Sequence, residues 1–461
     1  MARAIFVGGT ASNAGKSWFA TALCRWFARQ GVRVAPFKAQ NMSNNSFPLA
    51  GGGEIGRAQV AQAEACGLAP EAAMNPVLLK PCGDSRSQVI VHGKVWRTVD
   101  AMDYYKHSAE LRQESLRAYV DLAWRFDVIV IEGAGSVAEV NLRGREFTNL
   151  SLARDVDARC VLVADIERGG VFASVLGTLD LLPPEDRARF VCFAVNQFRG
   201  DRRLFDEGVA FLEERSGIPC LGVFPHAPEI HLDAEDSLAG LHGAGNSRVA
   251  IVRFPRVSNT TDFRLLPDAA WIDCPDARAF DVVILPGTKS TLADLEWLRE
   301  TGLAEWVIAQ HESGAQVLGI CGGYQMLGET ISDPDGADGV AGRVRGLGLL
   351  PVDTAMQAEK TTQVRRARTP AGAEFDAYEI HMGHTSSRRE LPPFALLEDG
   401  TQDGVVHGRV SGTYLHGALE SAAVLREFFG IVAQGADKQR HYDALADWLV
   451  ASASPGILGK L

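Results

Sequence analysis

Short apolar runs alternate with amphipathic stretches through the first half of the chain. Residues 4–7 are apolar, residues 18–29 carry apolar side chains at helical spacing, and residues 32–37 form a second apolar run. Runs of similar length recur at residues 127–131, 159–164, 190–196 and 220–224. Continuously apolar strands separated by helices are typical of parallel sheets buried on both faces. The pattern predicts an α/β fold with a doubly wound, mostly parallel sheet.

The alternation is interrupted between residues 226 and 247, where Pro228 and several glycines occur, and a second strand and helix series follows. Its apolar runs lie at residues 249–254, 281–285 and 316–320. A chain of 461 residues exceeds what one hydrophobic core usually supports. We therefore expect a first domain at residues 1–228, a linker at residues 229–247, and a second α/β domain at residues 248–461.

Composition and charge narrow the classes of partner. Hydrophobic residues make up 46% and charged residues 22%, which is ordinary for a globular protein. The net charge is −11 without a basic block, so we expect small-molecule substrates and neither nucleic acid nor a membrane as partner. The apolar start is too brief for a signal peptide, which predicts a cytoplasmic protein. Eight scattered cysteines favour neither a zinc site nor a disulfide framework, and nothing indicates an oligomeric state.

The first chemical motif is Gly9-Thr-Ala-Ser-Asn-Ala-Gly15-Lys16-Ser17, placed between a predicted strand and a predicted helix. Such a loop turns backbone N–H groups toward phosphate oxygens, while the lysine adds positive charge and the serine hydroxyl can hold Mg²⁺. Five residues separate the two glycines, one more than in the standard phosphate loop. We predict an ATP site that uses Mg²⁺, with nucleotide contacts from Gly9, Thr10, Asn13, Gly15, Lys16 and Ser17.

The longer loop resembles the dethiobiotin synthetase type of P-loop fold. The resemblance implies that Glu132, at the end of an apolar run, and Glu54 are ligands of Mg²⁺ together with Ser17. It also implies that Asn196, at the end of another run, contacts the nucleotide base. The alternatives are a polar strand end for Glu132, a solvated loop carboxylate for Glu54 and a turn former for Asn196.

A second motif, Ile320-Cys321-Gly322-Gly-Tyr-Gln325, follows a predicted buried strand and opens a helix. A cysteine between a strand and glycines sits on a sharp turn at a helix N-terminus, where the helix dipole favours the thiolate and backbone amides can stabilise an oxyanion. A cysteine nucleophile needs a base, and His416 in Gly412-Thr-Tyr-Leu-His416-Gly is the best candidate. We predict Cys321 and His416 as the catalytic pair.

These residues resemble the glutamine amidotransferase domain of the triad type. The resemblance implies that Gly287 and Gly322 form the oxyanion site and that Gln325 helps to hold glutamine. Many such domains place Glu two residues after the histidine, whereas position 418 is alanine, so the third triad member is absent or comes from elsewhere. Glu420 is a possible substitute, although an exposed carboxylate at a helix start is the more ordinary interpretation. His381 and His384 are expected to shape the glutamine site without binding a metal.

An ATP site joined to a glutaminase indicates a ligase that activates a carboxylate and amidates it with ammonia from glutamine. Long segments are similar to the cobyric acid synthase family, among them residues 37–45, 52–59, 75–81, 88–94, 164–172 and 378–383. That resemblance implies amidation of the b, d, e and g carboxylates of adenosylcobyrinic acid a,c-diamide. The substrate contacts it suggests are Lys38, Gln40, Asn41, Asn75 and Lys80, each of which could instead be an ordinary surface polar residue.

Two rival functions follow from the same motifs. The sister family, cobyrinic acid a,c-diamide synthase, shares both domains, but it typically reads Phe-Lys-x-Gly-Pro-Asp-Tyr where this chain has Phe37-Lys-Ala-Gln-Asn-Met42. The other rival is a nucleotide-switched binding protein with an inactive glutaminase domain. Such switches usually carry an additional lysine early in the loop, and they have no use for an intact Cys321 and His416 pair. Cobyric acid synthase is therefore the favoured family.

Overall fold

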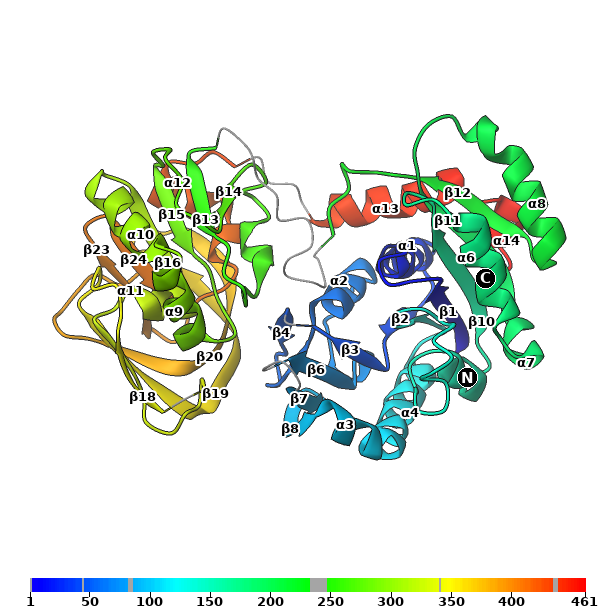
Figure 1. The fold of residues 1–461 in the computed structure, drawn as a ribbon, viewed down its shortest axis with the longest axis horizontal. Coiled ribbons are helices and arrows are strands. Elements are labelled where there is room, and N and C mark those ends of the chain that lie inside the picture. The colour runs from blue at the N-terminus through cyan, green and yellow to red at the C-terminus, as the bar shows by residue number, and fades with distance from the viewer. Residues whose placement is uncertain (1, 44, 82–85, 233–246, 340, 434–437) are drawn as a thin grey trace. The chain divides into compact units, whose positions relative to one another are not determined.

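The computed structural model describes residues 2–43, 45–81, 86–232, 247–339, 341–433 and 438–461. These residues form two compact units (Figure 1). The first unit contains the described residues of 1–43, 55–233 and 437–461. The second contains those of 44–54 and 234–436. Most of the expected linker, residues 233–246, lies outside the described residues.

A six-stranded parallel sheet forms the centre of the first unit, in the order β12-β11-β10-β1-β9-β2. Its strands lie within about two residues of the predicted runs, and the expected fold class is confirmed. Nearly continuous apolar sequence drives this burial, since β9 is buried at each position. The strands are β1 (Arg3–Gly9), β2 (Val34–Phe37), β9 (Val128–Glu132), β10 (Arg159–Asp165), β11 (Phe190–Phe198) and β12 (Cys220–Pro225).

Helices and a smaller sheet complete the first unit. The smaller sheet has the order β3-β6-β7-β8, with β3 (Gln40–Met42), β6 (Val77–Pro81), β7 (Arg86–Val91) and β8 (Lys94–Asp100). The helices are α1 (Lys16–Arg29), α2 (Arg57–Ala65), α3 (Ala101–Tyr104), α4 (Ser108–Arg125), α5 (Leu150–Asp155), α6 (Val171–Asp180), α7 (Pro184–Arg187), α8 (Asp206–Ser216), α13 (Lys438–Ser452) and α14 (Pro455–Leu458).

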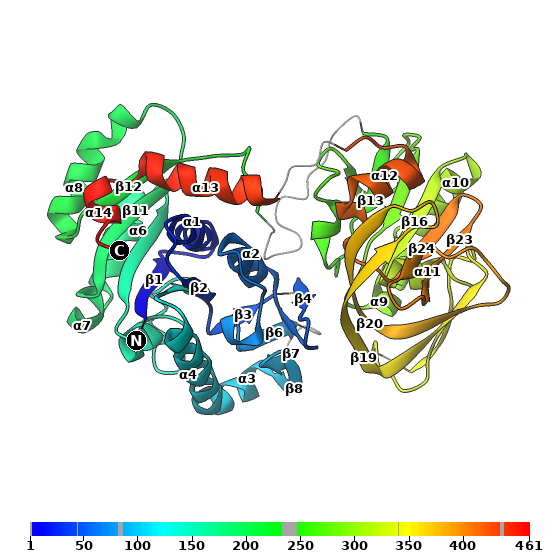
Figure 2. The same ribbon diagram turned by 180° about the vertical axis from the view of Figure 1, so that it is seen from behind.

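The last helices correct the expected domain ranges, because they belong to the first unit and not to the second. Figures 1 and 2 both show α13 beside α1. Trp448 packs its ring 5.3 Å from that of Phe19 and 4.8 Å from that of Phe224. Arg25 forms a 2.8 Å ion pair with Asp443. The apolar face of α13 thus completes the core on one side of the parallel sheet.

The second unit contains a six-stranded sheet in the order β14-β13-β15-β16-β24-β23, parallel except for β23. Three of its strands confirm predicted runs. The strands are β13 (Val249–Val252), β14 (Ala270–Ile272), β15 (Val282–Leu285), β16 (Gln316–Ile320), β23 (Val405–His407) and β24 (Val410–Thr413). The helices are α9 (Thr291–Glu300), α10 (Leu303–Glu312), α11 (Gly322–Leu327) and α12 (Ala422–Phe429).

A second sheet in this unit was not predicted, because its long strands lack a simple alternation of apolar and polar residues. A hairpin of β19 (Val352–Arg368) and β20 (Glu374–Ser387) dominates it. Its other strands are β17 (Thr330–Asp333), β18 (Gly342–Arg345), β21 (Ala395–Leu397) and β22 (Gln402–Asp403). The early segment of the chain adds the short pair β4 (Ser46–Pro48) and β5 (Glu54–Gly56). In the described part of the chain, no helix combines the length and hydropathy needed to cross a membrane.

Candidate active site

Cys321 occupies a sharp turn between β16 and α11. Its backbone has φ 54° and ψ −111°, a conformation that costs a residue with a side chain roughly 1–3 kcal/mol. The turn is held by a 2.8 Å hydrogen bond from the Cys321 N–H to the Thr413 carbonyl. The following turn of α11 runs so close to β15 that a Cβ at Gly323 would lie 2.0 Å from the Leu285 carbonyl oxygen. The strained turn therefore presents the thiol at the N-terminus of α11, as the sequence predicted.

His416 follows β24 and lies close enough to Cys321 for the two side chains to interact electrostatically. The Cys321 thiol donates its hydrogen bond to the Ile380 carbonyl oxygen at 3.6 Å. The ring is fully buried, and its Nδ1 lies 2.7 Å from Asp262 Oδ2. Burial opposes the charged imidazole, but the Asp262 carboxylate and the Cys321 side chain outweigh it and raise the pKa of His416 to about 10. The three side chains form the arrangement of a nucleophile, a base and an orienting carboxylate.

Asp262 is the functional residue that sequence reasoning missed. It lies in a short 3-10 turn, Thr260–Phe263, with 1% of its surface exposed, and its second oxygen accepts the Gly417 N–H at 2.7 Å. The structure does not bring Glu420 to His416, because the Glu420 carboxylate lies 3.4 Å from Arg264. The signal for Asp262 was weak: a polar run, residues 258–262, shortly after a predicted strand at the edge where parallel strands end.

The predicted glutamine-binding residues lie on the two segments next to the catalytic pair, the loop after β15 and the helix α11. A Cβ at Gly287 would lie 2.8 Å from His416 Cε1, and one at Gly322 would lie 2.6 Å from Thr288 Cγ2, so the loop after β15 passes directly over the turn. Gln325 is 2% exposed; its Oε1 accepts the Thr291 hydroxyl at 2.7 Å, and its Nε2 lies 3.3 Å from the Tyr414 hydroxyl. The structure thus places Gly287 beside His416, and Gly322 and Gln325 on the helix that begins directly after Cys321.

The histidines of β20 are placed differently from each other. The ring of His381 stacks on that of Tyr414, with 3.9 Å between centroids, and its Nδ1 lies 2.8 Å from the Gly383 carbonyl oxygen. His384 pairs with Ala355 across the hairpin. Within the described ranges, no group of three or more His, Cys, Asp or Glu residues is arranged to hold a metal ion.

The phosphate loop lies in the first unit between β1 and α1. Gly15 has φ 101°, and a Cβ there would lie 2.0 Å from Asn196 Nδ2, so only glycine fits. The Lys16 ammonium donates to the carbonyls of Ala11 at 3.0 Å and Gly135 at 2.9 Å. Gly9 ends β1, the Thr10 N–H donates to the Val163 carbonyl at 3.0 Å, and Asn13 has φ 62°. The predicted nucleotide residues are therefore assembled in one loop.

Glu132 is the centre of a buried polar cluster at the end of β9. Its Oε1 accepts the Ser17 hydroxyl at 2.9 Å and the Lys38 ammonium at 2.9 Å, and its Oε2 accepts the Gln62 amide. Burial alone would raise the pKa of the Glu132 carboxyl, but the charge and hydrogen bond of Lys38, with smaller contributions from Gln62 and Lys16, lower it. The carboxylate therefore stays ionised beside the phosphate loop. Lys38, expected to bind substrate, lies in this cluster.

Two other predicted residues, Glu54 and Asn196, have hydrogen-bond partners of their own. Glu54 belongs to the second unit, where its carboxylate accepts the Lys360 ammonium at 2.5 Å and the Ser46 hydroxyl at 2.6 Å. Asn196 is 2% exposed and donates to the Ala14 carbonyl at 3.0 Å, so its side-chain amide holds the backbone of the phosphate loop.

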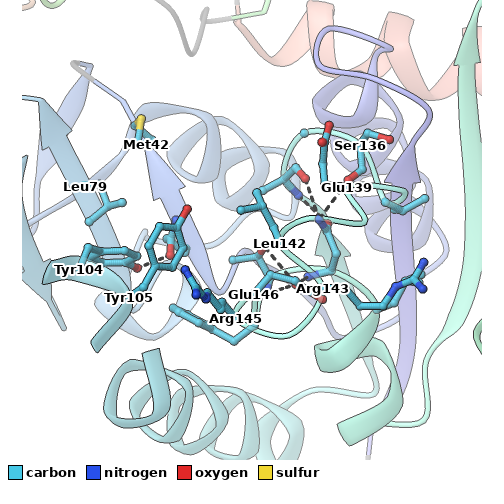
Figure 3. Close-up of a pocket in the computed structure, with 18 of the residues that line it drawn as sticks. Met42, Leu79, Tyr104, Tyr105, Ser136, Glu139, Leu142, Arg143, Arg145 and Glu146 are labelled. Carbon is cyan, nitrogen blue, oxygen red and sulfur yellow. Dashed lines mark hydrogen bonds between the residues drawn. The ribbon is translucent and has the colours of Figure 1, made fainter. Parts of the chain in front are cut away.

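A cavity of about 400 Å³ lies in the first unit beside the loop that follows β9 (Figure 3). Gly135, whose carbonyl accepts Lys16, also lines this cavity. Tyr104 and Tyr105 form part of its wall, and Arg143 and Arg145 lie on the loop that follows β9. The Arg145 guanidinium stands 5.8 Å from the centre of the Tyr105 ring. The cavity thus combines aromatic surface with charged side chains of both signs, since Glu139, Glu146 and Asp186 line it together with the arginines.

Of the predicted substrate residues, only Gln40 lines this cavity, and its side chain accepts the Tyr104 hydroxyl. Asn41 donates to Gln59 at 2.9 Å, and Asn75 donates to the backbone carbonyls of Lys38 and Val77 at 3.1 and 3.0 Å. Lys80 is 3% exposed on β6. Asn41, Asn75 and Lys80 are therefore buried away from the cavity wall.

The fold and these two sites define the class of protein: a nucleotide-binding P-loop domain joined to a glutamine amidotransferase. Residues 5–238 match the CobQ/CobB/MinD/ParA nucleotide binding domain, and residues 248–424 match the CobB/CobQ-like glutamine amidotransferase domain.

Relatives along the whole chain define the particular family. The cobyric acid synthase of Dehalococcoides mccartyi strain CBDB1 is 42% identical over 490 residues, which cover 98% of this chain and 97% of that protein. The cobyric acid synthase of Sorangium cellulosum strain So ce56 is 44% identical over 509 residues, covering 99% and 98%. That of Streptococcus sanguinis strain SK36 is 43% identical over 484 residues, covering 97% and 96%. The chain belongs to the cobyric acid synthase family.

Proposed function

We propose that this chain amidates the b, d, e and g carboxylates of adenosylcobyrinic acid a,c-diamide, with ATP as energy source and glutamine as nitrogen donor. The observation that carries the proposal is that a buried histidine–aspartate pair near Cys321 and a phosphate loop bonded to Glu132 occur in one chain, which is similar to cobyric acid synthases over nearly its whole length. A switch protein would have no use for the buried contacts among Cys321, His416 and Asp262.

Glutamine hydrolysis is assigned to Cys321. The thiolate attacks the side-chain amide carbon, and backbone amides at Gly287 and Gly322 stabilise the oxyanion that forms. His416 transfers a proton to the departing nitrogen, which leaves as ammonia, and Asp262 holds the imidazole in orientation. Water then attacks the thioester, glutamate leaves, and the thiol is restored.

Carboxylate activation is assigned to the phosphate loop. A carboxylate oxygen of the corrinoid attacks the γ-phosphorus of ATP, so that an acyl phosphate forms and ADP leaves. Ammonia then attacks the acyl carbon, phosphate leaves, and an amide remains. Lys16 supplies positive charge where charge develops on the transferred phosphoryl group.

Mg²⁺ fits the residues of this site. Hard divalent cations take oxygen ligands, and the Ser17 hydroxyl and the ionised Glu132 carboxylate, 2.9 Å apart, would supply two of them. Bound there, Mg²⁺ would neutralise phosphate charge. Glu54 is left out of this set because its carboxylate is bound by Lys360 and Ser46.

The acceptor site is assigned to the cavity beside Gly135. Its volume of about 400 Å³ is toward the lower end of roughly 300–1,000 Å³ for ligand sites, so it suits one carboxylate arm and an adjoining ring edge. Arg145 offers charge to the carboxylate, and Tyr105 offers apolar surface to the ring. Arg145→Gln should raise the KM for corrinoid and leave the KM for ATP unchanged. Arg203→Gln is the matched control, since Arg203 is exposed and pairs with Asp201.

The experiment that tests the function is mass spectrometry of the corrinoid after incubation with ATP, Mg²⁺ and either glutamine or ammonium. We expect four acid-to-amide exchanges on the a,c-diamide with both nitrogen donors. Cys321→Ala should lose the reaction with glutamine and keep it with concentrated ammonia at alkaline pH, because carboxylate activation needs no thiol. Amidation of the a and c carboxylates of cobyrinic acid instead, or glutamine use by Cys321→Ala, would contradict the proposal.

A further inference from the structure

A short segment from the N-terminal half of the sequence belongs to the amidotransferase unit. The chain leaves the first unit after residue 43 and returns to it at residue 55, and the described residues between, 45–54, are part of the second unit. They lie within residues 5–238, which match the nucleotide-binding family, and outside residues 248–424, which match the amidotransferase family. The transfer of phosphate from ATP to a carboxylate does not require residues 45–54 to belong to the amidotransferase unit.

Two successive polar contacts, from Asn45 to Asn259 and from Asn259 to His416, link the segment to the catalytic histidine. Asn45 is 1% exposed, and its Oδ1 accepts the backbone N–H of Asn259 at 2.8 Å. Asn259 has φ 57°, and its Nδ2 lies 3.2 Å from His416 Nε2. This is the ring nitrogen opposite to the one that Asp262 holds. Asn45 therefore supports a backbone turn whose side chain contacts the imidazole.

Contacts between aromatic rings form a second link between the segment and His416. The Phe47 ring lies 5.0 Å from that of Tyr378, which in turn stacks 5.2 Å from the His416 ring at an interplanar angle of 21°. Backbone hydrogen bonds of 3.0 and 2.9 Å join Tyr378 and His416 in both directions. The segment thus contacts the neighbours of His416 on more than one side.

The segment is anchored independently of these contacts. Glu54 at its far end is 3% exposed and binds the Lys360 ammonium and the Ser46 hydroxyl. A buried carboxylate is strongly held by an ammonium partner, because separating the two would leave a buried charge unpaired. The Glu54–Lys360 pair therefore anchors the far end of the segment, while Asn45 makes the contact that leads to the catalytic ring.

We propose that Asn45 is a positioning residue for glutamine hydrolysis, which acts on His416 through Asn259. The proposal rests on the proposed function, because it assumes that Cys321 and His416 hydrolyse glutamine. Its consequence is that the glutaminase reaction requires a residue from the sequence that otherwise builds the nucleotide-binding unit. The side chains of Asn45 and Asn259 touch neither the acyl phosphate nor ATP in this assignment, so amidation with free ammonia does not depend on them.

The test compares variants of the full chain in glutamate release and in ammonia-dependent amidation. Asn45→Ala removes the hydrogen bond to Asn259 and should lower the glutaminase kcat about tenfold, since one lost buried hydrogen bond of about 1–2 kcal/mol corresponds to roughly that factor. The KM for glutamine should stay within about twofold, because Asn45 does not contact the residues that hold glutamine. Asn45→Asp keeps the accepting oxygen and should recover most of the rate.

Ser46→Ala is the matched control, because it removes a hydrogen bond from the same segment but not the one to Asn259. Its glutaminase kcat should stay near that of the parent. If Ser46→Ala lowered kcat as much as Asn45→Ala, the segment would act by general rigidity and the positioning role would be refuted. Equal loss of ammonia-dependent amidation in Asn45→Ala would also refute it, since that reaction reports an intact fold and an intact phosphate site.

A double-mutant cycle tests the route itself. Asn259→Gly removes the amide and keeps the positive φ without strain. If Asn45 acts through Asn259, the double variant should be no slower in glutamate release than the slower single variant. Full additivity of the two effects would show that Asn45 does not act through Asn259.

The Cys321→Ala variant separates this inference from the proposed function. If Cys321→Ala abolishes glutamate release while Asn45→Ala leaves kcat unchanged, only this inference fails. If Cys321→Ala still hydrolyses glutamine, the proposed function fails.

Discussion

Replacing Asp262 by Asn tests the residue that completes the glutaminase site. The exchange keeps the size of the side chain but removes the charge that faces His416 Nδ1 at 2.7 Å, in a place where 1% of the aspartate is exposed. The introduced amide could also present its N–H₂ to the ring and favour the wrong tautomer. We therefore expect Asp262→Asn to impair glutamine hydrolysis and to leave carboxylate activation intact.

The size of the effect follows from burial. Removing one charge of a fully buried pair costs about 3–5 kcal/mol, and each 1.4 kcal/mol in a barrier corresponds to a tenfold change in rate. Not all of that loss falls on the transition state, since a cysteine keeps nucleophilic character without its full triad. We expect kcat/KM for glutamine to fall on the order of 10²–10³-fold.

The assay measures glutamate release and, separately, amide formation with concentrated ammonia. Glu420→Gln provides a matched carboxylate-to-amide control, because Glu420 lies 3.4 Å from Arg264 and not against His416. Its glutaminase rate should stay within about threefold of the parent, as expected for a pair of modest strength. Parental glutamate release by Asp262→Asn, or an equal loss in Glu420→Gln, would refute the assignment of Asp262 as the orienting carboxylate.

Three further predictions concern the phosphate site and the pH dependence of stability. Lys16→Ala should abolish amidation with both glutamine and ammonia while the protein stays folded, and near-parental turnover at saturating ATP would contradict the loop assignment. Glu132→Gln removes the charge that partners Lys38, so the Mg²⁺ concentration required for half-maximal amidation should rise at least tenfold; an unchanged Mg²⁺ titration would remove Glu132 from the metal site. The pKa of His416 in the folded protein, about 10, lies above its ordinary value of 6.5, so its stabilising contribution should be full below about pH 6.5 and be lost as pH rises toward 10. The difference in Tm between the parent and Asp262→Asn should shrink over that range, and a constant difference would contradict the raised pKa.

The local motifs were predictable because their geometry is encoded within a few residues. Gly15 permits the positive φ and the close approach of Asn196, and the glycines after Cys321 permit a helix to begin against the Leu285 carbonyl. A reader of the sequence can recognise such turns because few other residues fit them. The strands flanking them were equally clear, since burial on both faces demands continuous apolar runs.

The partners of buried charged residues could not be predicted from the sequence. Lys38 lies against Glu132, and Glu54 lies against Lys360, 306 positions away. In each case the sequence identified a polar residue in an unusual context but did not identify its partner. A buried charge requires a partner of opposite sign, but many carboxylates and ammonium groups along the chain satisfy that requirement equally well.

The sequence alone determined the fold class, the phosphate loop and the cysteine turn, because hydrophobic periodicity and glycine positions act over short stretches of backbone. Tertiary structure alone decided that Asp262 orients His416 across 154 positions, that the last helices complete the first core, and that residues 45–54 join the amidotransferase unit. These contacts arise from the packing of whole sheets and helices, in which many weak and non-directional contributions add up. A pattern within a short stretch of sequence does not contain these contributions, so the contacts between distant residues are known only from the folded chain.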